Sequence, residues 1–161
     1  MKFVSCDPGE ATGYAVWPSE TPGTQPEHVG TAALADFVAA IGIAAHVDEV
    51  GEPAREEGVR ELVEHFEGFR LLVFEDWALY PWKLKELAWD QCRTARGIGA
   101  LEYICVTAGI PTVAQGAKIK DAASAGGADA LFMRPLHANR HANDAIRHGV
   151  FYQLSRVAQP A

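Results

Sequence analysis

The chain has 161 residues, of which 48% are hydrophobic and 22% charged, and it carries a formal net charge of −7. These values are ordinary for a globular protein with a sizeable core, and we expect one domain spanning residues 1–161. No apolar run is long enough to cross a bilayer and nothing resembles a signal peptide, so we expect a cytoplasmic protein without a membrane partner. Three cysteines without CxxC spacing are typical of buried thiols in a reducing compartment.

The negative net charge argues mildly against a nucleic-acid partner, because contacts to phosphate need Lys and Arg. The charges are unevenly distributed, however. Residues 48–67 contain eight Asp or Glu against two Arg, whereas residues 83–156 contain ten Lys or Arg against six Asp or Glu. The acidic residues are concentrated in one segment, so the net charge does not exclude DNA or RNA.

The first seventeen residues predict a β-hairpin that holds a carboxylate. Residues 3–6 form an apolar run typical of a buried strand, which delivers Asp7 just before a Pro-Gly turn, and residues 14–17 form a second apolar run. Burying a lone carboxylate is costly, so Asp7 needs a partner such as a divalent metal. The simpler alternative is that Asp7 only starts the turn.

A second carboxylate follows the strongest strand of the sequence. After a weak strand near residues 28–31, the spacing of apolar residues predicts helices over 34–47 and 54–67. Residues 70–76 then read as a central strand that ends in Glu75 and Asp76. Strands that end in carboxylates at one edge of a sheet are how α/β folds assemble a site, so the repetition of this pattern points to one.

The middle of the chain contains candidate DNA contacts. Residues 77–82 carry three aromatic side chains, and Tyr80 and Trp82 are candidates either for stacking on bases or for a lid over the core. Residues 83–108 predict a long helix, on which Arg93 and Arg96 share a face that could meet phosphate or simply be a charged surface. Small residues in that helix allow close approach of the sheet or of a second subunit: Ala95, Gly99 and Ala100.

The last third of the chain adds basic residues and a His-Asp pair. A short strand at 111–115 is followed by Lys118 and Lys120, which we expect at the site end of that strand. On the helix predicted from residue 137 onwards, His141, Asp144 and His148 are spaced by three and four residues and therefore share a face.

Asp7, Glu75 and Asp144, with His141 beside the last, thus form a set of carboxylates from three separate elements. An oxygen-rich set of this kind suits Mg²⁺ and the two-cation hydrolysis of phosphodiesters. Zinc bound by three histidines, His137, His141 and His148, is the competing metal hypothesis, and we favour it less because it leaves Asp7 and Glu75 unexplained.

Taken together in chain order, the motifs of this sequence resemble those of RuvC-type Holliday-junction resolvases, and particularly the compact versions encoded by phages. The motifs are Asp7-Pro-Gly-x-x-Thr-Gly-Tyr, Leu-Leu-Val-Phe-Glu75-Asp, a long helix with Gly-x-Gly, Gly-Ile-Pro followed by Lys, and His141-x-x-Asp144-Ala-Ile-Arg-His. The resemblance implies an α/β, ribonuclease H-like fold with a central mixed β-sheet flanked by helices. It also implies Mg²⁺- or Mn²⁺-dependent cleavage of branched DNA by a homodimer.

The resemblance also assigns roles to residues. Asp7, Glu75, His141 and Asp144 match the catalytic and metal-binding positions of the family, and His141 stands where many members have Asp. Lys118 or Lys120 matches the basic residue that the family uses for phosphate. The mechanism that we expect has one metal bound by Asp7 and Glu75 and a second bound by Asp7 and Asp144.

Two other functions stay open on the sequence. One is a ribonuclease H-like nuclease that uses the same site on flaps, replication forks or RNA–DNA hybrids. The other is a non-catalytic nucleic-acid-binding protein that has kept the fold.

Overall fold

The computed structural model describes residues 1–46, 57–76, 92–125 and 139–157. Five strands form one mixed sheet in the order β3-β2-β1-β4-β5. The strands are β1 (Phe3–Asp7), β2 (Ala11–Trp17), β3 (His28–Ala33), β4 (Leu72–Glu75) and β5 (Thr112–Gln115). β1, β2 and β3 pair antiparallel, whereas β4 and β5 run parallel to β1. This arrangement confirms the predicted central mixed sheet.

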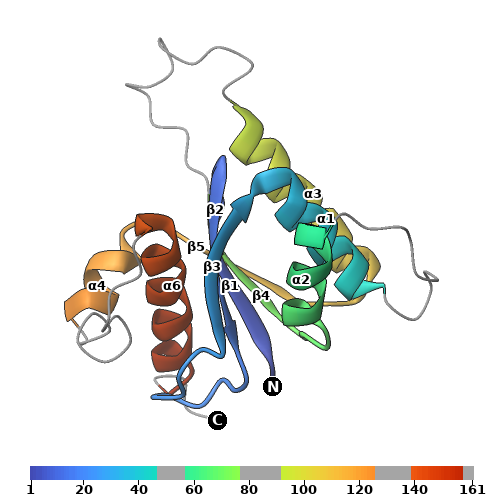
Figure 1. Ribbon diagram of the computed structural model, residues 1–161. Helices are drawn as coiled ribbons and strands as arrows, with labels where there is room; N and C mark the ends of the chain where they lie inside the picture. Colours follow the sequence, from blue (N-terminus) through green and yellow to red (C-terminus); the bar gives the residue numbers. More distant parts are fainter. Residues whose placement is uncertain (47–56, 77–91, 126–138, 158–161) are drawn as a thin grey trace.

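Helices cover both faces of the sheet (Figure 1). One face carries α1 (Leu34–Ala45), α2 (Glu57–Phe66) and α3 (Arg93–Thr107), and the other carries α4 (Ile119–Ala125) and α6 (Arg140–Val157). The apolar periodicity predicts all of these helices except α4, which is only seven residues long. No helix in these ranges is both long and apolar enough to cross a membrane.

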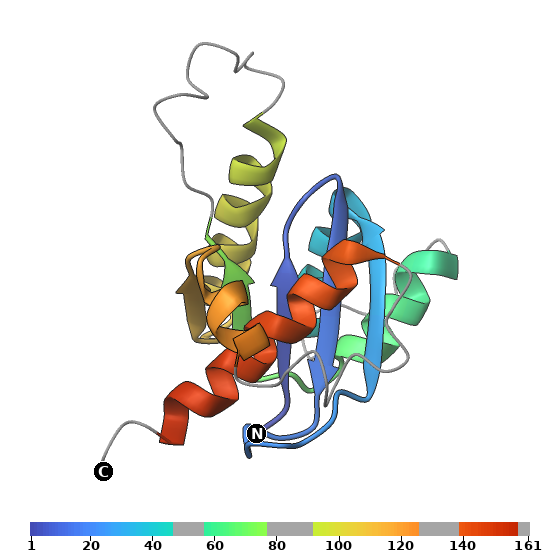
Figure 2. The same ribbon diagram turned by 90° about the vertical axis from the view of Figure 1, so that its left-hand side faces the viewer.

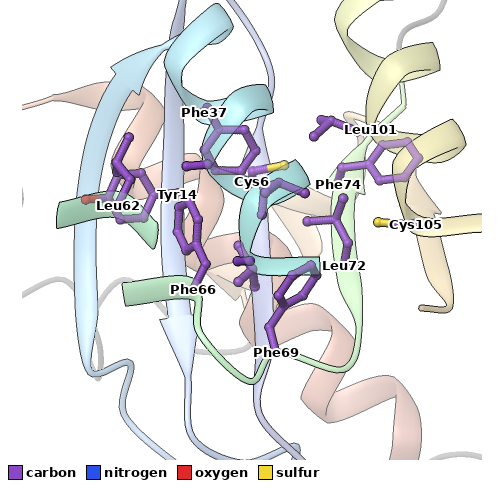
Figure 3. Close-up of a cluster of buried hydrophobic side chains, with 14 of the residues drawn as sticks. Cys6, Tyr14, Phe37, Leu62, Phe66, Phe69, Leu72, Phe74, Leu101 and Cys105 are labelled. Atoms are coloured by element: carbon purple, nitrogen blue, oxygen red, sulfur yellow. The ribbon is translucent and has the colours of Figure 1, made fainter. Parts of the chain in front are cut away.

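Alternation along the strands divides the core in two. Val4, Cys6, Leu72 and Phe74 point to the α1–α2–α3 side, where they pack with buried residues such as Phe37, Phe66 and Leu101 (Figure 3). The residues between them, Phe3, Leu71 and Val73 among others, pack instead with Ala145, Ile146 and Val150 of α6. Because Asp7 and Glu75 continue this second set, the sheet directs both carboxylates towards α6.

Close contacts fix α6 against the hairpin β1–β2, across which it runs in Figure 2. A Cβ atom on Gly13 would lie 1.9 Å from the carbonyl oxygen of His141, and one on Gly149 would lie 2.3 Å from the ring of Trp17. The Ser5 hydroxyl donates to the carbonyl of Ala145 at 2.7 Å and accepts from the Trp17 indole at 2.8 Å. Glycine at both positions therefore sets how near α6 approaches the strands that carry the site.

Candidate metal and nucleic-acid site

Two carboxylates and an amide lie at one edge of the sheet. Asp7 ends β1, Glu75 ends β4 and Gln115 ends β5, and these three strands are parallel, so their carboxyl ends coincide. Glu75 and Gln115 are direct partners in the β4–β5 register. The expected convergence of two strand-end carboxylates is therefore present, with a buried glutamine beside them.

The first three turns of α6 supply the opposite side of the site. Asn139 precedes the helix and its side-chain oxygen accepts a hydrogen bond from the backbone N–H of His141 at 2.8 Å, an N-cap that starts α6 at this point. His141, Asp144 and His148 then face the sheet edge, as their spacing predicts. Asp144 and His148 are buried, whereas His141 is partly open to solvent.

The ammonium of Lys120 lies between the three carboxylates. Its Nζ is 2.5 Å from Glu75 Oε2, 2.9 Å from Asp144 Oδ2 and 3.7 Å from Asp7 Oδ1. Lys120 belongs to α4, the helix that the sequence pattern does not predict, and its side chain is 20% exposed. Of the two lysines proposed for phosphate, one is thus engaged by carboxylates, while Lys118 is exposed.

Each carboxylate has a further nitrogen partner of its own. His141 Nδ1 lies 2.7 Å from Asp7 Oδ2, and Arg147 donates to Asp144 Oδ1 at 2.7 Å. His148 Nε2 lies 3.1 Å from Glu75 Oε2, and its Nδ1 lies 2.8 Å from Gln115 Oε1. The sequence does not predict the contacts that Arg147, His148 and Gln115 make here. Arg147 and His148 follow Asp144 by three and four residues, and this helical spacing could have indicated that they lie beside it.

The surroundings drive the pKa values of the two strand-end carboxyls apart. Burial raises the pKa of Asp7, in spite of its hydrogen bond to His141 and the nearby charge of Lys120. Burial acts in the same direction on Glu75, but hydrogen bonds from His148 and Lys120 outweigh it and lower that pKa to about 2. Burial likewise opposes the charge of Lys120, whose contacts with Glu75 and Asp144 nevertheless raise its pKa.

The donor set fits a hard divalent cation. Three carboxylates from β1, β4 and α6 converge on one positive group, and oxygen donors are what Mg²⁺ and Mn²⁺ prefer. Within the described ranges, no three His, Cys, Asp or Glu side chains are already arranged as a set of metal ligands. Because the ammonium of Lys120 lies between the three carboxylates, a metal ion bound by all three would have to replace it. His137, needed for the zinc alternative, lies outside the described residues.

The two predicted arginines line a groove to which Asp7, Glu75 and Asp144 do not contribute. Arg93 and Arg96 are exposed at the start of α3, where they line a groove of about 720 Å³ together with Glu10, Leu34 and Val38. Arg93 lies 3.7 Å from Glu10, which belongs to the turn just after Asp7. Tyr80 and Trp82 fall outside the described residues.

The sheet order and the helices on both faces give the chain a ribonuclease H-like α/β fold that matches the fold of RuvC. Two solved structures of RuvC from Thermus thermophilus support this fold assignment. The first, in complex with a Holliday junction substrate, has a TM-score of 0.66 at 16% identity and covers 99% of this chain and 97% of that chain. The second has a TM-score of 0.62 at 16% identity, with coverage of 98% and 97%. Neither protein-family models nor curated proteins give a match.

Proposed function

We propose that the chain is a divalent-metal-dependent endonuclease that cleaves branched DNA, with the four-way junction as its substrate. The proposal rests on one observation: Asp7, Glu75 and Asp144 converge on the ammonium of Lys120 at the carboxyl edge of a sheet with the RuvC-type fold. The similar RuvC structure that contains a Holliday junction substrate supports the choice of DNA.

The three carboxylates would hold Mg²⁺ or Mn²⁺, which supplies an activated water and stabilises the leaving oxygen in phosphodiester hydrolysis. Asp144 accepts from Arg147 and so keeps a fixed orientation on α6. His141 is positioned on Asp7 and open to solvent, so it can ligate a cation or carry a proton between the site and water.

Basic and aromatic side chains would hold the DNA around this centre. Arg93, Arg96 and Lys118 are exposed cations suited to backbone phosphates. Lys120 would reach a phosphate only after a metal had displaced it from the carboxylates. Tyr80 and Trp82 remain our proposed stacking residues at the branch point.

Symmetric cleavage of a junction requires two sites, whereas the part of the chain that the structure describes holds one such set of carboxylates. We place the dimer interface on α3, whose outer face exposes Gly99, Tyr103 (71%) and Val106 (74%). A Cβ on Gly99 would meet no atom within 4 Å, whereas one on Gly97 would lie 2.8 Å from Leu34. Gly97 thus allows α3 to pack closely against α1. Gly99 adds no side chain to the outer face of α3, which would allow a close two-fold contact between two copies of this protein, which we expect to be cytoplasmic.

Cleavage assays with Mg²⁺ on a four-way junction, a flap, a linear duplex and an RNA–DNA hybrid test the proposal. We expect paired nicks in the junction, little cleavage of the duplex, and none by Asp7→Asn, because Asn is nearly isosteric but a poor ligand for a hard cation. Preferred cleavage of the flap or the hybrid would show that the same metal-dependent hydrolysis acts on that substrate instead of the four-way junction. Binding of branched DNA without any Mg²⁺-dependent nicking would show that the chain is a DNA-binding protein and not a nuclease.

A further inference from the structure

His148 is the most deeply buried titratable side chain at the site. It is 0% exposed and lies on α6 one turn after the buried Asp144. Burying a polar ring without hydrogen bonds is costly, and here both ring nitrogens have partners: Glu75 Oε2 at 3.1 Å and Gln115 Oε1 at 2.8 Å. The ring therefore joins the ends of two neighbouring strands, β4 and β5, to α6.

The proton positions follow from the partners. The Glu75 oxygen that His148 contacts is also paired with the ammonium of Lys120, so it acts as a carboxylate acceptor, and His148 Nε2 carries the hydrogen that is donated to it. On the other side, either Nδ1 also carries a hydrogen and donates to the Gln115 oxygen, or the Gln115 amide is rotated and its NH₂ donates to Nδ1. In both arrangements His148 donates to Glu75.

His148 and Lys120 share the same oxygen of Glu75 but differ in what they can do. The ammonium of Lys120 is at the end of a flexible chain at the point where a cation would bind, so metal binding would remove it. The His148 ring is enclosed and bonded at its far side to Gln115, whose backbone pairs with Glu75 in the sheet. Only the contact from His148 can persist in both states.

From this we infer that His148 is a positioning residue for Glu75: its Nε2–H, itself held by Gln115, orients the carboxylate towards a divalent cation. The inference rests on the proposed metal-dependent function. Groups that orient ligands in this way typically change metal affinity by 10–100-fold when they are removed.

The test uses three variants and the affinity for Mn²⁺ alone, measured by titration calorimetry without DNA. His148→Leu removes both hydrogen bonds at similar volume, and His148→Gln retains an amide donor. Gln153→Leu is the matched control, because Gln153 is a second buried polar residue of α6 that donates to the carbonyl of Ser19, away from the carboxylates. Melting curves record the stability of each variant separately.

We expect His148→Leu to raise the Kd for Mn²⁺ by about 10–100-fold, His148→Gln to recover part of that loss, and Gln153→Leu to keep the Kd of the original chain while melting earlier. If His148→Leu does not fold, the Gln variant decides, because it should still bind measurably more weakly than the original. Equal Kd values for His148 variants and the original chain, or an equal loss in Gln153→Leu, would overturn the inference. Absence of Mn²⁺ binding by the original chain would instead refute the metal-dependent function.

Discussion

Replacing Lys120 by methionine is the sharpest perturbation of the proposed site. Methionine keeps most of the length of the side chain but removes the charge that three carboxylates share. Without a cation, Asp7, Glu75 and Asp144 would repel one another in a mostly buried position, and the folded state should lose free energy relative to the unfolded state.

The magnitude follows from the burial of the pair. Removing one partner of a buried ion pair costs about 3–5 kcal/mol, whereas an exposed pair contributes less than about 1 kcal/mol. Because the Lys120 side chain is 20% exposed and Asp144 is almost fully buried, we expect a loss of about 2–4 kcal/mol in the free energy of unfolding. For a chain of this length that corresponds to a melting temperature lower by about 4–16 °C.

Metal should reverse the effect. Mg²⁺ at 100 times its Kd stabilises a folded protein by about 2.7 kcal/mol, and in Lys120→Met it would no longer compete with an ammonium for the carboxylates. Melting curves with and without Mg²⁺ should therefore show a larger upward shift for Lys120→Met than for the original chain. Lys118→Met is the control, because Lys118 is exposed and should change neither value. A Lys120 variant as stable as the original without metal, or one less responsive to Mg²⁺, would refute this account of the centre.

Three further predictions concern the carboxylates, the dimer and pH. Asp7→Asn should melt with a smaller Mg²⁺-induced shift than the original chain, and equal shifts would place the ion elsewhere. Gly99→Arg should give folded monomers by sedimentation that nick junction strands one at a time, and a dimeric variant would exclude α3 as the interface. Burial, and then the stacked ring of His28 at 3.9 Å, lower the pKa of His65. The unfolded chain thus binds the proton more readily, so stability should fall as pH drops below about 6.5, the ordinary histidine value. Urea unfolding at pH 7.5 and 5.5 should show this loss in the original chain but less of it in His65→Gln.

Features that depend on spacing along the chain could be predicted from the sequence. The apolar run before Glu75 marked a strand covered on both faces, and the three- and four-residue spacing of His141, Asp144 and His148 placed them on one helical face. Parallel strands bring their carboxyl ends together whatever the loops between them do, so Asp7 and Glu75 could be expected at one edge.

Contacts between distant segments could not be predicted in the same way. Lys120 follows β5 on a seven-residue helix with little apolar periodicity, and nothing local distinguishes a lysine that meets phosphate from one that meets carboxylates. Gln115 and His148 are 33 residues apart, and each alone resembles an ordinary polar residue at the end or side of an element. Their pairing depends on the closeness of α6 to the sheet, which Gly13 and Gly149 set.

The two strand-end carboxyls show why the helix matters as much as the sheet. Asp7 and Glu75 occupy equivalent positions at the ends of adjacent parallel strands, yet their pKa values move in opposite directions. Glu75 receives two strong donors, one from α6 and one from α4, and these more than offset its burial. Asp7 is more deeply buried, and its contacts with His141 and Lys120 do not compensate. The sheet thus brings the carboxylates together, whereas the helices packed against it determine how firmly each one holds its negative charge for a cation.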